Sequence, residues 1–189
     1  MANDKSFKIK NGLSVGTRYE SKAGADGESA VGPSDTFSTT LYSGNGGTQT
    51  ITNNINLSTD GGLVWVKQRT GSSAQHALYD TERGTLKGLA SSNTSGSATE
   101  TSVTSFNSDG FSLGTHNNSS GEDYVSWTFK KATDFFDIVT YTGDGTTSRS
   151  INHSLGSAPG SIFIKQTSST GENWIVWHRS ISNEVSGEI

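Results

Sequence analysis

The chain has 189 residues, of which 30% are hydrophobic and 17% are charged, and its formal net charge is −4. This mild acidity argues against nucleic acid and against an anionic membrane as partners. Cysteine is absent, which excludes disulfides, thiolate metal sites and cysteine nucleophiles. No apolar run approaches the ~20 residues of a membrane-spanning helix, and residues 1–10 lack the apolar core of a signal peptide. We therefore expect no membrane insertion, and assembly in a cytoplasm rather than export.

Serine, threonine and glycine are abundant, with 31, 24 and 23 residues. Disorder is the competing interpretation, but disordered chains usually combine low hydrophobicity with high net charge and few aromatic residues. This chain has 4 Trp, 8 Phe and 5 Tyr, and most of them fall in short apolar runs. The composition therefore predicts an all-β protein whose short strands are joined by many polar turns.

The first of three regions, residues 1–36, is predicted to be an extended N-terminal arm and linker. Its apolar side chains alternate with polar ones around an Asn-Gly dipeptide, a strong hairpin signal: Phe7, Ile9, Leu13 and Val15. A lone two-stranded hairpin is marginal in water, whereas an apolar strand with free edges can add to a neighbour's sheet. We expect these four side chains to anchor the protein to a partner.

The second region, residues 37–135, has the pattern of a β-sandwich domain: short strands bounded by turn residues. Its last strand alternates apolar and polar side chains. This pattern predicts that Val125, Trp127 and Phe129 are buried on one sheet face, with Tyr124 on the other, polar face.

Turn residues predict two hairpins within this region. Residues 107–110, Asn-Ser-Asp-Gly, separate two short apolar runs and mark the first. Residues 76–90 are compatible with a short helix or with a second hairpin, and Arg83-Gly84 in the middle favours the hairpin. The apolar run 63–66 suits a strand that is covered on both faces.

The third region, residues 136–189, repeats the second at an offset of about 98 positions. Residues 160–166 match residues 62–68, and Trp174 to Trp177 stand where His76 to Tyr79 stood. A period this long indicates tandem domains rather than a solenoid. We therefore predict that both blocks have the same secondary structure and that residues 136–189 are a partial copy of the domain, in a fragment of a longer chain.

Two sets of side chains are candidates for ligand binding. Asp80 and Arg83 form the best-marked charged pair, which either binds a ligand or locks a tight turn before Gly84. Glycosidases need two carboxylates, and no second one is tied to Asp80 by spacing. Exposed aromatic rings could stack on sugars, and the candidates for this are Tyr124, Trp174 and Trp177, although a place in the core is the favoured interpretation for all three.

The remaining polar residues do not form a recognisable catalytic or metal-binding motif. The four histidines lack metal-ligand spacing: they are His76, His116, His153 and His178. Asp60 or Asp144 could bind calcium, but no ladder of alternating aspartates accompanies either of them. We expect no catalytic residues, no metal, no cofactor and no enzymatic activity.

Several motifs, taken in order, resemble a domain common in structural proteins of marine and cyanobacterial phages. They are Gly-Leu-Val-Trp-Val-Lys at 62–67, His-Ala-Leu-Tyr-Asp-Thr-Glu-Arg-Gly at 76–84, Thr-Ser-Phe-Asn-Ser-Asp-Gly-Phe at 104–111 and Tyr-Val-Ser-Trp at 124–127. The resemblance covers most of residues 37–135, and the second copy lacks the Asp-Thr-x-Arg-Gly segment. It implies tandem β-sandwiches of the jelly-roll, concanavalin-like type. The opening residues 7–13 also resemble the N-termini of phage fibre proteins.

The function expected from this resemblance is that of a bacteriophage virion structural protein, the virion-proximal part of a tail fibre. It would attach through its N-terminus to other virion proteins of the tail, adaptor or nozzle type, and would project its β domains toward the host surface. The resemblance also implies a homo-oligomer, with a trimer favoured, and a host surface glycan as a further partner. Two alternatives are a stand-alone carbohydrate-binding, lectin-like module and a glycan-degrading enzyme of the same sandwich class.

Overall fold

The computed structural model describes residues 33–71, 76–99 and 101–180. The fold is all-β, as the composition predicted, and the described residues include a single short helix. The elements in chain order are α1 (Pro33–Thr36), β1 (Phe37–Ser43), β2 (Gln49–Thr52), β3 (Gly62–Gln68), β4 (Ala77–Asp80), β5 (Lys87–Ala90), β6 (Ala98–Thr99), β7 (Val103–Asn107), β8 (Gly110–Leu113), β9 (Asp123–Lys130), β10 (Ser161–Ile164) and β11 (Ile175–His178).

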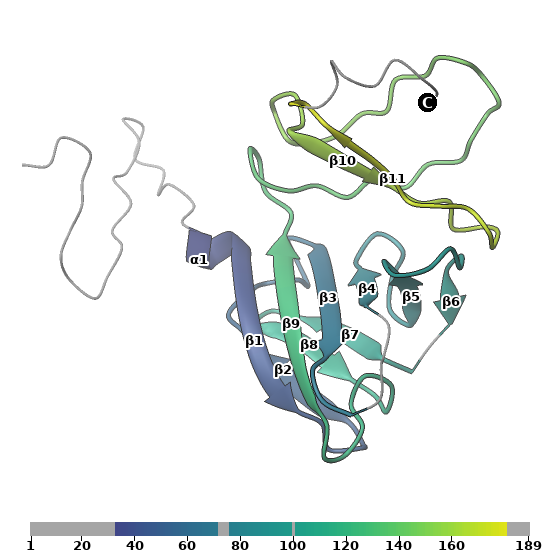
Figure 1. Ribbon diagram of the computed structural model, residues 1–189. Coiled ribbons are helices and arrows are strands. Elements are labelled where there is room, and N and C mark those ends of the chain that lie inside the picture. Colours follow the sequence, from purple (N-terminus) through teal and green to yellow (C-terminus); the bar gives the residue numbers. More distant parts are fainter. Residues whose placement is uncertain (1–32, 72–75, 100, 181–189) are drawn as a thin grey trace, which may run out of the picture.

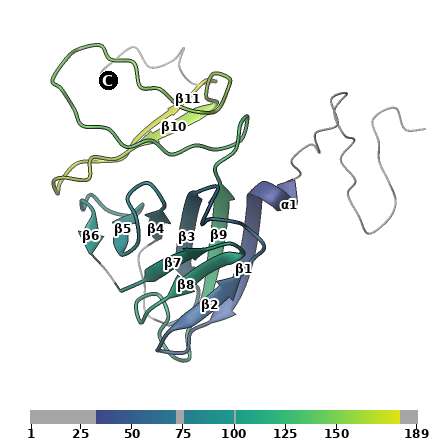
Figure 2. The same ribbon diagram turned by 180° about the vertical axis from the view of Figure 1, so that it is seen from behind.

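Two antiparallel sheets face each other in the part of the chain up to β9 (Figure 1). The larger sheet has six strands in the order β1-β9-β3-β4-β5-β6. Its centre is non-local, because β9 lies between β1 and β3, with Phe37 opposite Phe129 and Trp65 opposite Trp127. The smaller sheet, in the order β2-β8-β7, covers one face of the larger one (Figure 2).

The hydrophobic core fills the space between the two sheets, so this part of the chain is a β-sandwich. The larger sheet contributes Val64, Val66 and Tyr79, and the smaller one contributes Val103 and Phe111, all of them fully buried. The alternation of β3 explains its share of this core. Val64 and Val66 point inward, while Leu63 and Trp65, which alternate with them, face the other side and are only half-buried.

Both predicted hairpins are present. The turn Ser108-Asp109 joins β7 to β8, with Asn107 opposite Gly110. A Cβ at Gly110 would overlap the carbonyl oxygen of Ile51 in the neighbouring strand β2, so only glycine fits there. The ambiguous stretch 76–90 forms the antiparallel pair β4 and β5, which confirms the hairpin over the helix.

The predicted orientation of β9 is wrong. Val125 is buried, as predicted, but Trp127 and Phe129 are only half-buried on the outer face of the large sheet. The side chains that face the core are Tyr124, Ser126 and Thr128. Polar side chains are tolerated inside because they find partners. Asn53 donates to the Thr128 hydroxyl across 2.8 Å, and the Ser126 hydroxyl donates to a carbonyl oxygen of β1.

The blocks 62–68 and 160–166 both form a strand, over the whole of the first block and over residues 161–164 of the second, and their hairpins have the same register. In the first copy Val64 lies opposite Tyr79, and in the second Ile162 lies opposite Trp177, which is a shift of 98 positions in both strands. The counterparts of β1 and β2, in residues 137–151, have no regular structure. In the first copy β1 pairs with β9 and β2 pairs with β8. The described residues of the second copy contain only the two strands β10 and β11.

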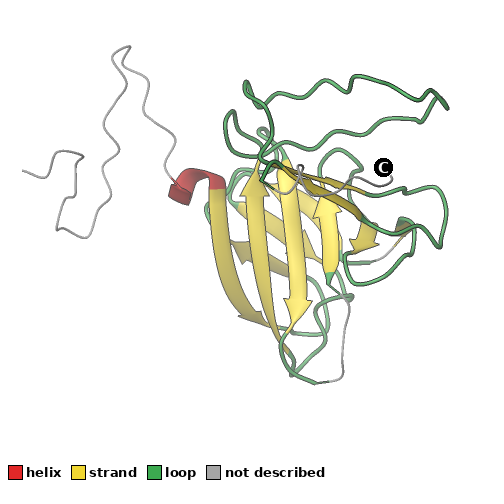
Figure 3. Ribbon diagram, turned by 45° about the horizontal axis from the view of Figure 1, so that its top comes forward, coloured by secondary structure: helices red, strands yellow, loops and turns green. Residues whose placement is uncertain are grey.

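The second hairpin lies beyond one end of the sandwich and touches the loop between β5 and β6 (Figures 1 and 3). The indole N–H of Trp174 donates to the carbonyl oxygen of Ala90 across 3.0 Å. The amides of Ser97 and Gly171 donate to the carbonyl oxygens of Thr167 and Thr94. Trp174 thus holds the two copies together, a role its sequence position did not reveal.

Candidate ligand-binding surfaces

Asp80 and Arg83 lock the turn that follows β4. The Asp80 carboxylate accepts the backbone N–H of Arg83 at 2.8 Å and its side-chain Nε–H at 2.6 Å. The same guanidinium donates to the carbonyl oxygen of Leu78 and to the hydroxyl of Ser97. The Asp80 side chain is 7% exposed and the Arg83 side chain is 11% exposed. The pair is therefore a buried, charge-assisted clamp between the turn and the loop beyond β5, and this geometry matches the structural alternative of the two predicted for it.

Tyr124 is not available as a stacking platform for sugars. Its side chain is 1% exposed and stacks on Tyr42 with 5.1 Å between ring centroids. Its hydroxyl accepts the backbone N–H of Ser119 at 3.0 Å, while that of Tyr42 donates to the carbonyl oxygen of Asn117. Burial raises the pKa of Tyr42 well above its ordinary value. Tyr124 faces away from Trp127 and Phe129, as the alternation predicted, but that face is the core and not a polar surface. The structure therefore has the core alternative for Tyr124, and both tyrosines satisfy their hydroxyls inside the sandwich.

The outer face of the large sheet carries an aromatic cluster formed by Trp65, His76 and Trp127. The two indoles meet edge to face at 5.7 Å between centroids, and Trp65 meets the His76 ring at 5.8 Å. Trp65 donates its indole N–H to Nδ1 of His76 across 3.1 Å. This bond requires a neutral imidazole whose proton lies on Nε2. Burial and, to a smaller extent, the charge of Lys67 lower the pKa of His76, which favours that neutral form.

This aromatic cluster is the best candidate for a binding surface, because its three rings are half-buried and lie on a face that the small sheet does not cover. On the same face, Leu41 is 63% exposed on the edge strand β1. The sequence analysis missed the cluster. The available signal was the spacing of Val64 and Val66, which places Trp65 between them on the opposite face. The contact with Trp127 depends on the pairing of β3 with β9, which the sequence does not indicate.

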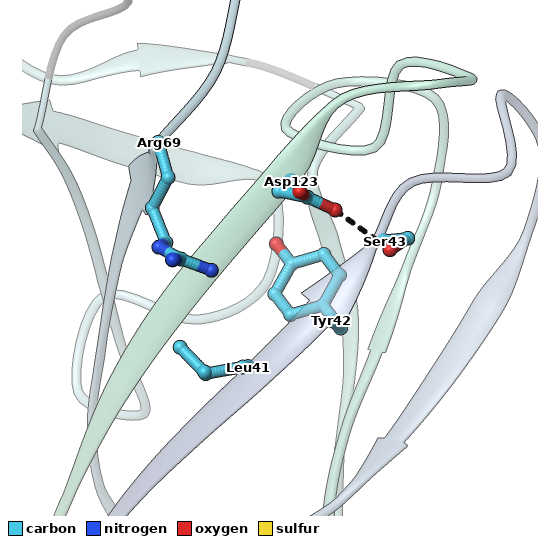
Figure 4. A pocket seen from close by; sticks show the side chains of 5 residues that line it. All are labelled: Leu41, Tyr42, Ser43, Arg69 and Asp123. Atoms are coloured by element: carbon cyan, nitrogen blue, oxygen red, sulfur yellow. Dashed lines mark hydrogen bonds between the residues drawn. The ribbon is translucent and has the colours of Figure 1, made fainter.

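A hollow of about 280 Å³ lies at one end of β1 and β9. Figure 4 shows the side chains that line it, which are Leu41, Tyr42, Ser43, Arg69 and Asp123. The Ser43 hydroxyl donates to the Asp123 carboxylate across 2.7 Å, and the Asp123 carbonyl oxygen accepts the backbone N–H of Arg69. Both groups of Asp123 therefore help to join three strands at this end of the sheet. We assign the hollow a structural role.

The other candidates are accounted for by local contacts. Asp60 lies 3.2 Å from Lys130, and Asp144 accepts hydrogen bonds from Thr146. No group of three or more His, Asp or Glu side chains that could hold a metal ion occurs in the described part of the chain. Nor does any helix in the described ranges have the length and apolar character needed to cross a membrane. Trp177 is half-buried on β11.

The predicted anchor residues Phe7, Ile9, Leu13 and Val15 lie outside the described residues, as does most of the predicted arm. Comparison with curated proteins and with solved structures gives no match. One protein family, described as a domain of unknown function (DUF7483), matches residues 32–189. This match begins just before α1 and spans the sandwich together with the second hairpin, and the chain therefore belongs to the DUF7483 family.

Proposed function

We propose that the protein is a non-enzymatic structural component of a bacteriophage particle, built from repeated β modules that project toward the host surface. One observation carries the modular part of this proposal. The β3–β4 hairpin recurs as β10–β11 in the same register, 98 positions later. Chains that extend by adding similar modules are suited to fibres and projections. The phage assignment rests on the resemblance of residues 37–135 and of residues 7–13 to phage structural proteins.

The strongest charged pair supports a structural role. Asp80 and Arg83 use their hydrogen-bonding groups on each other and on neighbouring backbone, and both are largely shielded from solvent. A catalytic acid or base has to reach the proton that it transfers. Attachment to other virion proteins is assigned to the N-terminal arm, and assembly into a homotrimer remains part of the same proposal.

The attachment role is tested by truncation in the phage that carries this protein. A chain that begins at Pro33 lacks the arm but keeps every residue of the hydrophobic core, which lies between Tyr42 and Tyr124. We expect its melting temperature to change by less than about 2 °C, because changes outside the core usually cost under ~0.5 kcal/mol. We expect the same chain to be absent from purified particles analysed by mass spectrometry.

Two full-length variants provide a matched control for this truncation. Replacing Phe7 and Ile9 with serine should prevent incorporation, whereas replacing Lys8 and Lys10 with serine should leave it intact, because the apolar side chains make the predicted contact. Normal incorporation of the truncated chain would show that the β modules, and not the arm, attach the protein to the particle.

A lectin-like role is the second candidate, and the aromatic cluster of Trp65, His76 and Trp127 favours it. For this candidate we expect Trp127→Ala to weaken retention on an array of bacterial surface polysaccharides by at least about tenfold, equivalent to ~1.4 kcal/mol. Phe111→Leu, a conservative change inside the core, should leave retention unchanged. Equal retention of both variants would remove the cluster as a glycan site.

A further inference from the structure

One edge of the second hairpin has no partner strand among the described residues. β10 pairs with β11 alone, whereas its counterpart β3 lies between β4 and β9. An exposed apolar edge strand offers a row of backbone donors and acceptors to any extended chain. Native proteins usually protect such edges, so an unprotected apolar one indicates a binding site.

The backbone bonds of the two hairpins correspond one to one. In the first copy the amide of Thr81 donates to the carbonyl oxygen of Gly62 at 3.1 Å, and in the second copy Arg179 donates to Gly160 at 2.9 Å. Backbone groups along a strand point alternately to its two sides. Those of Ile162 therefore face β11, and those of Ser161 and Phe163 face the open edge. Their counterparts in β3, Leu63 and Trp65, are hydrogen-bonded to β9.

The side chains of β10 are those of an interior strand left uncovered. Val64 and Val66 are 0% exposed in the core, while their counterparts Ile162 and Ile164 are 39% and 37% exposed. Phe163, the counterpart of Trp65, is 66% exposed. An exposed apolar surface of this kind is expected to be covered by another chain segment.

A glycine at the start of the strand indicates what approaches it. A Cβ at Gly62 would overlap the carbonyl oxygen of Phe129 in β9, so glycine is needed there because the two strands lie so close. Gly160 stands at the same place in the second copy, where a Cβ would meet only the side chain of Arg179. The second copy thus has the glycine that a strand in the β9 position requires.

We propose that the open edge of β10 binds an antiparallel strand of the β9 type, of the kind that a β module of this family supplies. The occupant has the β9 pattern: hydroxyl-bearing side chains toward the core, and aromatic side chains toward the outer face, as in Asp123–Lys130. Transferring the β3–β9 register by 98 positions places Phe163 opposite the residue equivalent to Trp127, and Ser161 opposite that equivalent to Phe129. The inference concerns the module itself and does not rest on the virion role.

The test adds a synthetic peptide, residues 121–132 of this chain, to the isotope-labelled full-length protein and follows amide hydrogen exchange by NMR. We expect the Phe163 amide to exchange about tenfold more slowly when the peptide concentration is ten times its dissociation constant. The Ser161 amide should follow it. The amides of Ile162 and Ile164 should not change, because they already face β11.

Two modified peptides and one protein variant give the matched controls. Methylating the backbone nitrogen of the Trp127 position should abolish the effect, because that N–H faces β10, whereas methylation at Thr128 should preserve it, because that N–H faces the opposite side. Gly160→Ala should weaken binding of the unmodified peptide at least about tenfold, equivalent to ~1.4 kcal/mol, because its Cβ occupies the space of the incoming carbonyl oxygen.

Three results would overturn the proposal. The first is no change in exchange at ~1 mM peptide, a concentration that detects even weak complexes. The second is equal activity of the two methylated peptides. The third is a Phe163 amide that is already protected in the full chain and becomes unprotected when residues 1–32 are removed, which would make the N-terminal arm the occupant. The first two outcomes leave the particle-incorporation experiment, and so the proposed function, unaffected. The third would also give the N-terminal arm a role other than attachment, and the incorporation of the Phe7 and Ile9 variant tests that role separately.

Discussion

Replacing Tyr124 with alanine is expected to lower the free energy of unfolding by about 3–5 kcal/mol, as for other large aromatic side chains removed from a core. The ring is 1% exposed and stacks on Tyr42. Its loss also leaves the backbone N–H of Ser119 without the acceptor that it has in the folded protein. Chemical denaturation monitored by tryptophan fluorescence measures the change.

Trp127→Ala is the matched control, because Trp127 belongs to the same strand but faces outward. It should cost clearly less than Tyr124→Ala, since the indole is only half-buried and keeps part of its surface in water in the folded protein. If the two costs came in the reverse order, the inward face of β9 would have to be the one carrying Trp127.

This pair of variants also shows where sequence reasoning reached its limit. Polarity ranks Val125, Trp127 and Phe129 above Tyr124, Ser126 and Thr128 as core residues, yet the second set faces the core. The choice of face depends on whether hydroxyl groups find partners inside, and those partners come from distant parts of the chain, such as Asn53 for Thr128. A strand shifted by one residue reverses every side chain, so local alternation could predict the strand but not its orientation.

Short sequence patterns correctly predicted the turns and strands that depend only on neighbouring residues. The turn at residues 107–110, the hairpin around Arg83-Gly84 and the strand at 63–66 all depend on residues close together in the sequence. The insertion of β9 between β1 and β3 joins residues about 60 to 90 positions apart, and no periodicity in a single sequence indicates such a pairing. The aromatic cluster was missed for the same reason, since Trp65 and Trp127 meet only through that pairing.

The repeat was the exception to this limit. Its two copies are 98 positions apart, and the sequence match alone predicted that both blocks have the same secondary structure. Repetition carries long-range information because the first copy serves as a template for the second.

Asp80→Ala should be the other strongly destabilising substitution, lowering the free energy of unfolding by about 3–5 kcal/mol. Removing one partner of a buried ion pair leaves the other charge without compensation, and the Arg83 side chain is 11% exposed. The matched control is Asp60→Ala, because Asp60 lies 3.2 Å from Lys130 but its side chain is 40% exposed. Exposed pairs contribute only about 0–1 kcal/mol.

A double-mutant cycle with Arg83→Met measures how far the Asp80 effect comes from the pair itself. We expect the Asp80→Ala, Arg83→Met double variant to be more stable than the sum of the single changes predicts, by about 1–3 kcal/mol, because it no longer buries a lone guanidinium. Strict additivity in denaturation experiments would contradict the assignment of the pair as a turn clamp. Near-neutral single variants would contradict it too, and would reopen the alternative in which Asp80 and Arg83 are maintained to bind a ligand.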